Sequence, residues 1–314
     1  MIELYAAPLE GITTAVWRAA HRRIFGGADR YYTPFLSPNA NLSFQPKELR
    51  EITTGEVDLV PQLLTNRPEY FLWAARELEQ MGFRQVDFNL GCPSGTVVAK
   101  HKGAGLLTDP QQLDAVLAEI FAAMPHMAIS VKTRIGRYDA DEWPALLAVY
   151  EKYPLCQLTV HPRVQKEFYT GAAHRDVFRS TLSATRLPLV YNGDVTTPDD
   201  PALTWGCPVM VGRGLAADPA LLRRIRGGHS ATRRELRDFH DALYDGYAAY
   251  MGPAAVGRLR ELWNYLAQCY RDADRPLKAI RKAKSPADYL PAAHAILDAC
   301  PLADDLSKNG IAVF

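Results

Sequence analysis

A cysteine stands on a loop that follows an apolar stretch, a position from which side chains often do chemistry. The segment DFNLGCPSG, residues 87–95, puts Asn89 before and Cys92 after the end of a predicted buried strand. Loops at strand ends hold side chains in place and leave them open to a ligand. Cys92 is therefore the first candidate for a reactive group.

Similar polar endings follow other short apolar runs. Residues with donor or acceptor groups stand at or just after the ends of these runs, at Glu10, Gln62, Asn89, Lys132, Arg134, His161, Arg163, Asn192, Asp194 and Arg213. Amide, imidazole and ammonium groups gathered at one edge are costly unless a polar ligand satisfies them. Their repetition favours one binding site over a set of unrelated positions.

The apolar runs predict the elements that position these residues. Eight β-rich runs recur with helical patterns between them: IELYAA, RYYTPFL, DLVPQLL, QVDFNL, AISVKTR, QLTVHPR, LPLVYNGD and CPVMVGRG. Helix start signals stand at Thr13, at Asn66-Arg67-Pro68 and at Asp109-Pro110. The alternation predicts an α/β fold, a parallel (β/α)8 TIM barrel over residues 1–227, whose active site lies at the carboxyl ends of the strands.

The β pattern stops after the predicted barrel, and residues 232–314 are expected to form a small all-helical domain. Helices are predicted over about residues 233–250, 254–271, 276–283 and 286–299. Gly227-Gly228, with Ser230, predicts a hinge before them. Between Arg223 and Lys284 there are 14 Lys and Arg against 7 Asp and Glu, although the net charge of the chain is only +1. This asymmetry predicts a basic face on the helical domain.

Composition narrows the class of protein. No apolar run reaches the roughly 20 residues that a membrane-spanning helix needs. The start MIELYAAPLEG lacks a basic leader, so we expect a cytoplasmic protein. The five cysteines lie far apart in the sequence, which disfavours a zinc site, and we expect no bound metal. Cys156 and Cys207, at the starts of apolar runs, are expected to be buried.

The last two strand ends indicate a cofactor. Gly193 follows the seventh run and Gly212 the eighth, ahead of a helix predicted to begin near Asp218. Such loops allow backbone N–H groups to approach a phosphate. Lys132 and His161 would meet a flat ring that needs hydrogen-bond donors, as the isoalloxazine of a flavin does.

These motifs together resemble one family. The chain is similar to the tRNA-dihydrouridine synthase family, FMN enzymes with a barrel and a C-terminal helical domain, in carrying APLEG, PQLL, DFNLGCP, GAGLL, VKTRIG, VHPR, YNGD and VGRG in this order. The NxGCP followed by GAxLL is the more specific part, because VKxR and NGD also occur in other FMN barrels. The chain departs from the family at Gly95, where many members carry a lysine.

The resemblance implies a role for each matched residue, with Cys92 as the catalytic one. Positions that hold FMN in the family match Pro8, Gln62, Lys132, His161, Asn192, Gly193, Gly212 and Arg213, to which we add Asp194. Contacts with the substrate are expected from Glu10, Asn89, Arg134 and Arg163. The implied reaction is an NADPH-driven reduction of the C5–C6 double bond of specific uridines in tRNA. The tRNA partner would be gripped by the basic helical domain, and we expect a monomer.

The reduction of uracil determines the form in which Cys92 acts. The double bond takes up a hydride at C6, from the flavin, and a proton at C5, from a positioned acid. The thiol must be protonated for this role, whereas a nucleophile needs a depressed pKa and a neighbouring base. No residue next to Cys92 in the sequence supplies such a base, and Lys100, His101 and Lys102, further along the same loop, would have to approach it in space. We therefore favour a proton donor.

Three alternatives stay open. A small-molecule FMN oxidoreductase of the dihydroorotate or dihydropyrimidine dehydrogenase type would leave the basic helical domain without a purpose. A barrel aldolase would use Lys132 as a Schiff base and contain no flavin. A non-catalytic RNA-binding relic would have no reason to keep Cys92 and the cofactor residues.

Overall fold

The computed structural model describes residues 2–52, 55–56 and 58–303, and its strands form one sheet of parallel pairs. The order is β3-β2-β1-β9-β8-β7-β6-β5-β4. Its two end strands, β3 (Leu59–Val60) and β4 (Gln62–Leu63), are separated in the chain only by Pro61. The single run DLVPQLL thus supplies both ends of the sheet, and the predicted TIM-like barrel is confirmed. The other strands are β1 (Leu4–Ala6), β2 (Arg30–Tyr32), β5 (Gln85–Leu90), β6 (Ala128–Gly136), β7 (Gln157–Val164), β8 (Leu189–Tyr191) and β9 (Val209–Val211).

The chain divides into two compact units, which we call the strand unit and the helical unit. The strand unit comprises residues 2–8, Arg30–Gly193 and Ala202–Met210. The helical unit comprises Leu9–Asp29, Asp194–Pro201 and residues 211–303. The division into domains at residues 227 and 232 stays a prediction.

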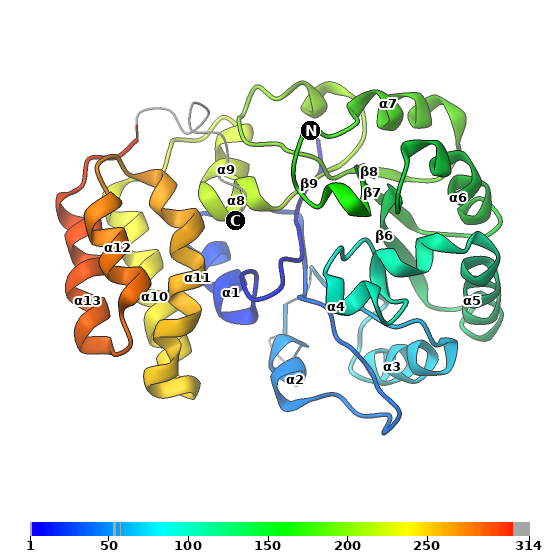
Figure 1. Ribbon diagram of the computed structural model, residues 1–314, viewed down its shortest axis with the longest axis horizontal. Coiled ribbons are helices and arrows are strands. Elements are labelled where there is room, and N and C mark those ends of the chain that lie inside the picture. The colour runs from blue at the N-terminus through cyan, green and yellow to red at the C-terminus, as the bar shows by residue number, and fades with distance from the viewer. Residues whose placement is uncertain (1, 53–54, 57, 304–314) are drawn as a thin grey trace. The chain divides into compact units, whose positions relative to one another are not determined.

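Helices alternate with the strands in the strand unit. They are α2 (Pro46–Ile52), α3 (Pro68–Gln80), α4 (Gly95–Val98), α5 (Pro110–Ala123), α6 (Trp143–Tyr150) and α7 (Arg175–Ala184). Figure 1 shows α3, α5, α6 and α7 along the outside of the strands. The Asp109 carboxylate accepts the N–H groups of Gln111 and Gln112, both at 3.0 Å, and so caps α5 where the sequence predicts its start.

The two faces of the strands differ in polarity. Alternate residues of a strand share a face, and along β5 the apolar Val86 and Phe88 alternate with Asp87 and Asn89. Hydrogen bonds join this polar set to Gln62 of β4. Residues in and next to the strands β1, β2, β3, β8 and β9 contribute a hydrophobic cluster of Tyr5, Ala7, Tyr32, Val60, Val190 and Met210. The polar side chains of the barrel are therefore concentrated on β4 to β7.

The helical unit contains the first helix of the chain and the predicted C-terminal helices, which are confirmed. Its helices are α1 (Ala15–Ile24), α8 (Arg213–Ala217), α9 (Leu221–Ile225), α10 (Arg233–Met251), α11 (Ala255–Leu266), α12 (Asp274–Lys282) and α13 (Pro286–His294). Helix α1 packs on α10 through the rings of Trp17 and Phe239, whose centroids lie 6.0 Å apart. The hydroxyls of Thr14 and Tyr247, 2.7 Å apart, add a buried hydrogen bond.

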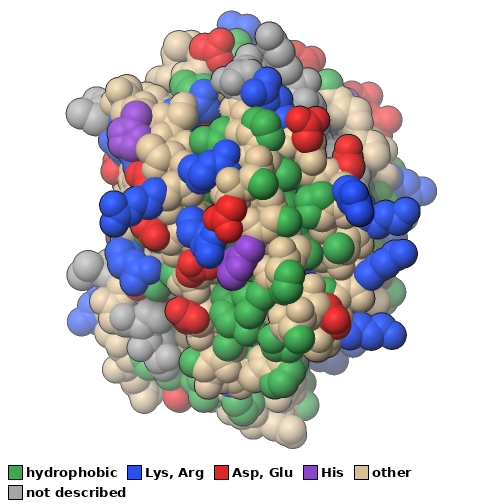
Figure 2. Space-filling model, turned by 90° about the vertical axis from the view of Figure 1, so that its left-hand side faces the viewer, with side chains coloured by type: hydrophobic (Ala, Val, Ile, Leu, Met, Phe, Trp, Pro, Cys, Tyr) green, Lys and Arg blue, Asp and Glu red, His purple; other side chains and the backbone are tan. Residues whose placement is uncertain are grey.

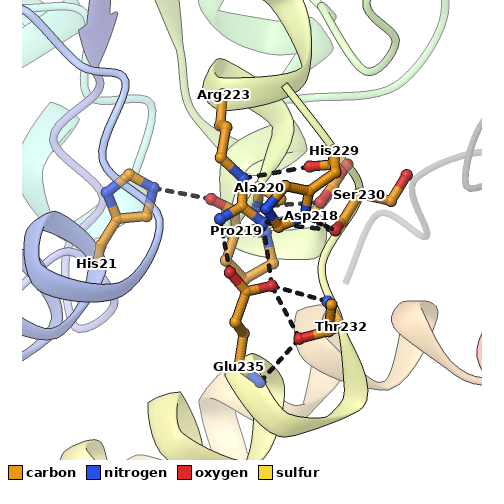
Figure 3. Close-up of polar contacts among 9 residues, drawn as sticks. All are labelled: His21, Asp218, Pro219, Ala220, Arg223, His229, Ser230, Thr232 and Glu235. Atoms are coloured by element: carbon orange, nitrogen blue, oxygen red, sulfur yellow. Dashed lines mark hydrogen bonds and ion pairs between the residues drawn. The ribbon is translucent and has the colours of Figure 1, made fainter. Parts of the chain in front are cut away.

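The predicted hinge between α9 and α10 is cross-linked by Arg223 (Figure 3). Its guanidinium donates to both carboxylate oxygens of Glu235, at 2.6 and 3.1 Å, and to the His229 carbonyl at 3.1 Å. Glu235 also accepts the Thr232 N–H at 2.9 Å and completes a capping box for α10. A Cβ at Gly228 would lie 2.6 Å from Cγ of Arg223, so glycine leaves room for this arginine.

One local prediction, the burial of Cys156, is wrong. Cys156 is exposed, whereas Cys207 is buried as expected, although both lie just before the first residue of a strand. The helix expected near Asp218 is α9, which begins at Leu221, and a further short helix, α8, precedes it and begins at Arg213, directly after Gly212. Asp218 ends α8, because Pro219 has no N–H to continue it.

Within the described ranges, no helix combines the length and the apolar character needed to cross a membrane.

We predict that Gly214→Ala lowers the free energy of unfolding, by about 1–3 kcal/mol. A Cβ at this position would lie 2.2 Å from the backbone carbonyl oxygen of Val195, which has no freedom to move away. Gly257→Ala is the matched control in α11, where a Cβ meets nothing within 4 Å, and is expected to stabilise the protein by about 0.5–1 kcal/mol. Urea unfolding measures both changes, and equal stability of the two variants would contradict the steric explanation.

Candidate active site

The Cys92 loop is held from within its own motif. The side-chain oxygen of Asn89 accepts the N–H groups of Gly91, at 3.1 Å, and Cys92, at 2.9 Å. The Cys92 carbonyl accepts the Ala104 N–H at 3.1 Å, and a Cβ at Gly103 would lie 2.9 Å from that carbonyl. The NxGCP and GAGLL motifs are therefore packed against each other, and the thiol is half-buried between solvent and barrel.

A chain of two amides connects this loop to the interior of the barrel. Nε2 of Gln62 donates to Oδ2 of Asp87 at 2.7 Å, and Nδ2 of Asn89 donates to Oε1 of Gln62 at 2.7 Å. An ionised carboxylate only accepts hydrogen bonds. Asp87 therefore determines that Gln62 turns its NH2 group inward and its oxygen toward Asn89. This leaves the oxygen of Asn89 for the backbone of the Cys92 loop.

Asp87 is fully buried and was not singled out by the sequence analysis. Ser130 donates to its second oxygen at 2.7 Å, and Gln85 donates to Ser130 at 3.2 Å. Burial raises the pKa of Asp87 to about 6, opposed by the hydrogen bonds from Gln62 and Ser130 and by the charge of Lys132. The available signal is the alternation of polar residues in QVDFNL and SVKTR, which marks a polar face on these strands.

Lys132, on β6, is half-buried next to this network. Burial and the charge of Arg134 lower its pKa to about 8, and Asp87 and Cys92 oppose that shift. The ammonium group is therefore mostly charged at neutral pH. It donates no hydrogen bond to any residue in the described part of the chain. Its three donors are available to a ligand.

His161, on β7, is a neutral group with a fixed tautomer. Its Nδ1 lies 2.6 Å from the carbonyl oxygen of Asn192, which only accepts, so Nδ1 carries the proton. Burial, together with the charges of Arg134, Lys132 and Arg163, lowers its pKa well below the ordinary value. Nε2 is then an acceptor, and Nη1 of Arg163 lies 3.3 Å from it.

Two buried arginines shape the loops around Cys92. Arg134 donates from Nε to the Gly91 carbonyl at 3.0 Å, and its guanidinium lies 5.1 Å from the ring centroid of Tyr169. Arg163 donates to the Gly171 carbonyl at 2.6 Å. Both are 1 % exposed. Arg134 links the end of β6 to the Cys92 loop, and Arg163 links β7 to the loop at Gly171. Tyr169 was missed by the sequence analysis, because nothing local to it predicts the stacking of Arg134.

The remaining predicted residues fall into two groups. Pro8 and Gly193 follow β1 and β8 in the strand unit, and a Cβ at Gly193 would overlap the Tyr191 hydroxyl. In the helical unit, Gly212 precedes the first residue of α8, and Arg213 pairs with Asp194. Glu10, also in that unit, is exposed.

The structure thus gathers one set of predicted residues in the strand unit: Gln62, Asn89, Cys92, Lys132, Arg134, His161, Arg163 and Asn192. The set contains four basic side chains, those of Lys132, Arg134, His161 and Arg163, and one thiol, and the carboxylate of Asp87 is buried next to it. The fold and this site define an α/β-barrel enzyme. The roles assigned to the individual residues stay predictions.

The chain matches the model of the family described as "Dihydrouridine synthase (Dus)" over residues 5–250, and it belongs to this family. A protein of Cupriavidus necator named "tRNA-dihydrouridine(16) synthase" is 32% identical over 301 residues, covering 90% of this chain and 93% of that one. A Ralstonia nicotianae protein of the same name is 32% identical over 309 residues, covering 92% and 94%. A "Probable tRNA-dihydrouridine synthase" of Staphylococcus aureus is 30% identical over 263 residues, covering 77% of each chain. The family predicted from the motifs is confirmed.

We predict that Asp87→Asn changes how stability depends on pH. In the parent the folded pKa is raised from 3.8 to about 6, so the folded state keeps a proton that the unfolded state has lost between these values. Stability should therefore fall as pH rises through that window, by roughly 1–3 kcal/mol, and the Asn variant should lack this fall. Urea unfolding across the pH series measures it. Ser130→Ala removes a hydrogen bond to the carboxylate and should move the upper end of the window to higher pH; identical curves for all three proteins would refute the assignment.

Proposed function

We propose that this protein reduces the C5–C6 double bond of a uridine in tRNA, with FMN as its bound cofactor and NADPH as the reductant. The observation that carries the proposal is the ammonium group of Lys132, which has no hydrogen-bond acceptor among the described residues and stands beside neutral His161 and Cys92. Membership of the family supports the reaction, and the names of its relatives support tRNA as substrate. A cytoplasmic location and a monomeric state stay predictions.

The donor set of the strand unit fits a flavin ring. The isoalloxazine presents carbonyl oxygens and ring nitrogens that accept hydrogen bonds. Lys132 offers three N–H groups, and Gln62, which uses one N–H on Asp87, keeps a second. When bound, FMN supplies the hydride for C6 of the uracil. The positive charge of the half-buried Lys132 favours an electron-rich edge of the ring.

Within the helical unit, the phosphate of FMN is assigned to Gly212 and Arg213. The guanidinium of Arg213 is only slightly exposed and is held by the carboxylate of Asp194 within the helical unit. Asp194 then acts by orienting Arg213, since a carboxylate and a phosphate repel each other. Gly212 directly precedes α8 and adds no side chain next to the assigned phosphate.

Cys92 is assigned as the acid that delivers a proton from Sγ to C5. Addition of hydride at C6 leaves negative charge on the uracil, chiefly on its O4 oxygen, until C5 is protonated. The cationic groups of Lys132, Arg134 and Arg163 favour that charge in a buried setting. Asn89 holds the backbone of Cys92 through its 2.9 Å hydrogen bond, which fixes the direction from which the thiol approaches.

The binding of RNA is assigned to α12 and to Lys284, which lies two residues after its end. Several arginines of the predicted basic face serve the fold: Arg237 pairs with Asp241 and Asp298, and Arg233 donates to the Leu297 and Cys300 carbonyls. Figure 2 shows Lys and Arg side chains on both sides of an area where hydrophobic side chains gather. The exposed basic residues of α12 and its C-terminal flank are Arg275, Lys278, Arg281, Lys282 and Lys284. Phosphate contacts from such residues are independent of sequence.

The first test of the function is anaerobic. The protein is reduced with NADPH, and flavin absorbance is followed after addition of unmodified tRNA or free uridine. Reoxidation by tRNA alone is expected. A protein without flavin absorbance would favour the barrel aldolase or the non-catalytic RNA-binding protein. Reoxidation by a small pyrimidine but not by tRNA would indicate a small-molecule oxidoreductase.

We predict that Cys92→Ala keeps its flavin and its rate of reduction by NADPH but loses dihydrouridine formation by a factor of about 10²–10⁴, the usual effect of a positioned acid. Cys156→Ala, which removes an exposed thiol outside this site, is the matched control and should retain activity. Mass spectrometry of the tRNA product measures the loss. If Cys92→Ala forms as much dihydrouridine as the parent, Cys92 is not the acid.

We predict that the affinity for FMN falls as pH rises through about 8, where Lys132 loses its proton in the free protein. Bound FMN favours the charged form, so the midpoint should lie at or above this value. Lys132→Met should bind FMN more weakly and without this transition. Titration of the apoprotein by flavin fluorescence measures both curves. A parallel pH dependence in the two proteins would exclude an ammonium–flavin contact.

A further inference from the structure

Two loops of the strand unit carry exposed aromatic and basic side chains at the carboxyl ends of β6 and β7. We call Arg137, Tyr138, Lys166 and Phe168 the β6–β7 rim. Tyr138 is 50 % exposed and Phe168 is 47 % exposed. Single exposed hydrophobic residues are common and need no explanation. The surroundings of these two rings distinguish them from ordinary surface residues.

Two cations lie against the ring of Tyr138. The guanidinium carbon of Arg137 is 4.9 Å and the ammonium nitrogen of Lys166 is 4.6 Å from its centroid. The Lys166 N–H donates to the Arg137 carbonyl at 3.1 Å, which joins the two loops. In the ranges that the structure describes, neither cation forms an ion pair with a carboxylate, and Arg137 donates instead to the Thr108 hydroxyl at 2.6 Å.

The carboxylate of Glu142 in the first loop accepts hydrogen bonds from backbone N–H groups. It accepts the N–H groups of Arg137, at 2.8 Å, Tyr138, at 2.8 Å, and Asp139, at 3.0 Å. The loop is therefore rigid, and this carboxylate is occupied without neutralising the side chains of Arg137 and Lys166 directly. A rim that combines aromatic rings with unneutralised cations is complementary to bases and phosphates.

Phe168 has a backbone conformation that a bulky residue rarely adopts, with φ of 50°. Glycine would take it without strain. The turn is enforced from both sides, because the Phe168 N–H donates to the Gln165 carbonyl at 3.0 Å and Glu167 bonds both the Val164 N–H and His174, each at 2.7 Å. Strain of this kind is typical of functional positions. Here it keeps an aromatic ring on the surface.

The rim is bonded to the loop that carries the candidate acid. Nε2 of Gln165, in the second loop, donates to the Pro93 carbonyl at 3.0 Å. Tyr169, next to Phe168, lies under Arg134, which donates to the Gly91 carbonyl. Phe168 therefore belongs to a loop that is hydrogen-bonded to the Cys92 loop through Gln165.

We propose that the β6–β7 rim binds the RNA strand beside the target uridine, with Phe168 stacking on a neighbouring base and Arg137 and Lys166 contacting phosphates. The inference rests on the proposed function, because it requires a uridine that leaves its stack in a folded RNA. A base that has lost its stacking partner is stabilised by an aromatic ring that takes the partner's place. Such stacking tolerates any base, so the rim supplies affinity and position rather than sequence selection.

The experiment compares the parent with Phe168→Ala, Phe168→Gly and Phe168→Trp on an unmodified tRNA transcript. Binding is measured by fluorescence anisotropy, and KM and kcat by dihydrouridine formation. Loss of stacking should weaken binding by about 5- to 150-fold and raise KM for the Ala and Gly variants, with Trp close to the parent. Gly relieves the backbone strain, so weak binding by both variants identifies the ring as the cause. Met81→Ala, which removes a side chain that is 47 % exposed elsewhere in the strand unit, is the matched control.

Further measurements separate this inference from the proposed function. Flavin content and reduction by NADPH should be unchanged in all Phe168 variants. Lys166→Ala should make the slope of log K against log salt shallower by about 0.7–0.9, the value for one phosphate that the protein no longer neutralises. If the parent reduces uridine in tRNA and Phe168→Ala binds and reacts equally well, the proposal that the β6–β7 rim binds RNA is refuted, and the proposed function is retained. If Phe168→Trp binds tRNA as weakly as Phe168→Ala, stacking by Phe168 is also refuted. If the parent reduces no uridine in RNA, both the rim proposal and the proposed function are refuted.

Discussion

The buried carboxylate of Asp87 is the constraint on which the candidate active site depends. It has only acceptors to offer, so the donors of Gln62 and Ser130 must turn toward it. The orientation of the Gln62 amide determines the orientation of the Asn89 amide, which donates to it. The Asn89 oxygen then accepts the backbone N–H of Cys92. A single charged group inside the barrel therefore orients a loop that lies at its rim. Hydrogen bonds that are all satisfied in this way rigidify a polar core.

Charge balance explains why such a group is retained inside a barrel. A carboxylate without water is unfavourable, and its raised pKa expresses this cost. Lys132 compensates part of it, while Asp87 in turn favours the charged ammonium. Arg134 and Arg163 add positive charge that Asp87 alone does not balance, and His161 responds by staying neutral. The site as a whole is therefore suited to a ligand with electron-rich oxygen and nitrogen atoms.

The local signals in the sequence were reliable wherever one residue decides a backbone conformation. Asp109 caps α5 as predicted, and the eight apolar runs form the barrel strands. The prediction for Cys156 failed because burial at the edge of a strand depends on what packs over it. The polar face of β5 was overlooked because a hydropathy pattern does not distinguish polar residues that face solvent from polar residues that are buried inside a barrel. Asp87 and Ser130 belong to that face.

The sequence by itself determined the order of strands and helices, the residues that stand at the strand ends and the membership of the dihydrouridine synthase family. These follow from periodicity and from short motifs, whose physical causes act between neighbours in the chain. Only the tertiary structure decided the tautomer of His161, the orientation of the Gln62 amide and the use of Arg233 in fold contacts. Each of these depends on a partner from another element, and the direction of a hydrogen bond or the neutralisation of a charge is set by the group that the fold brings opposite.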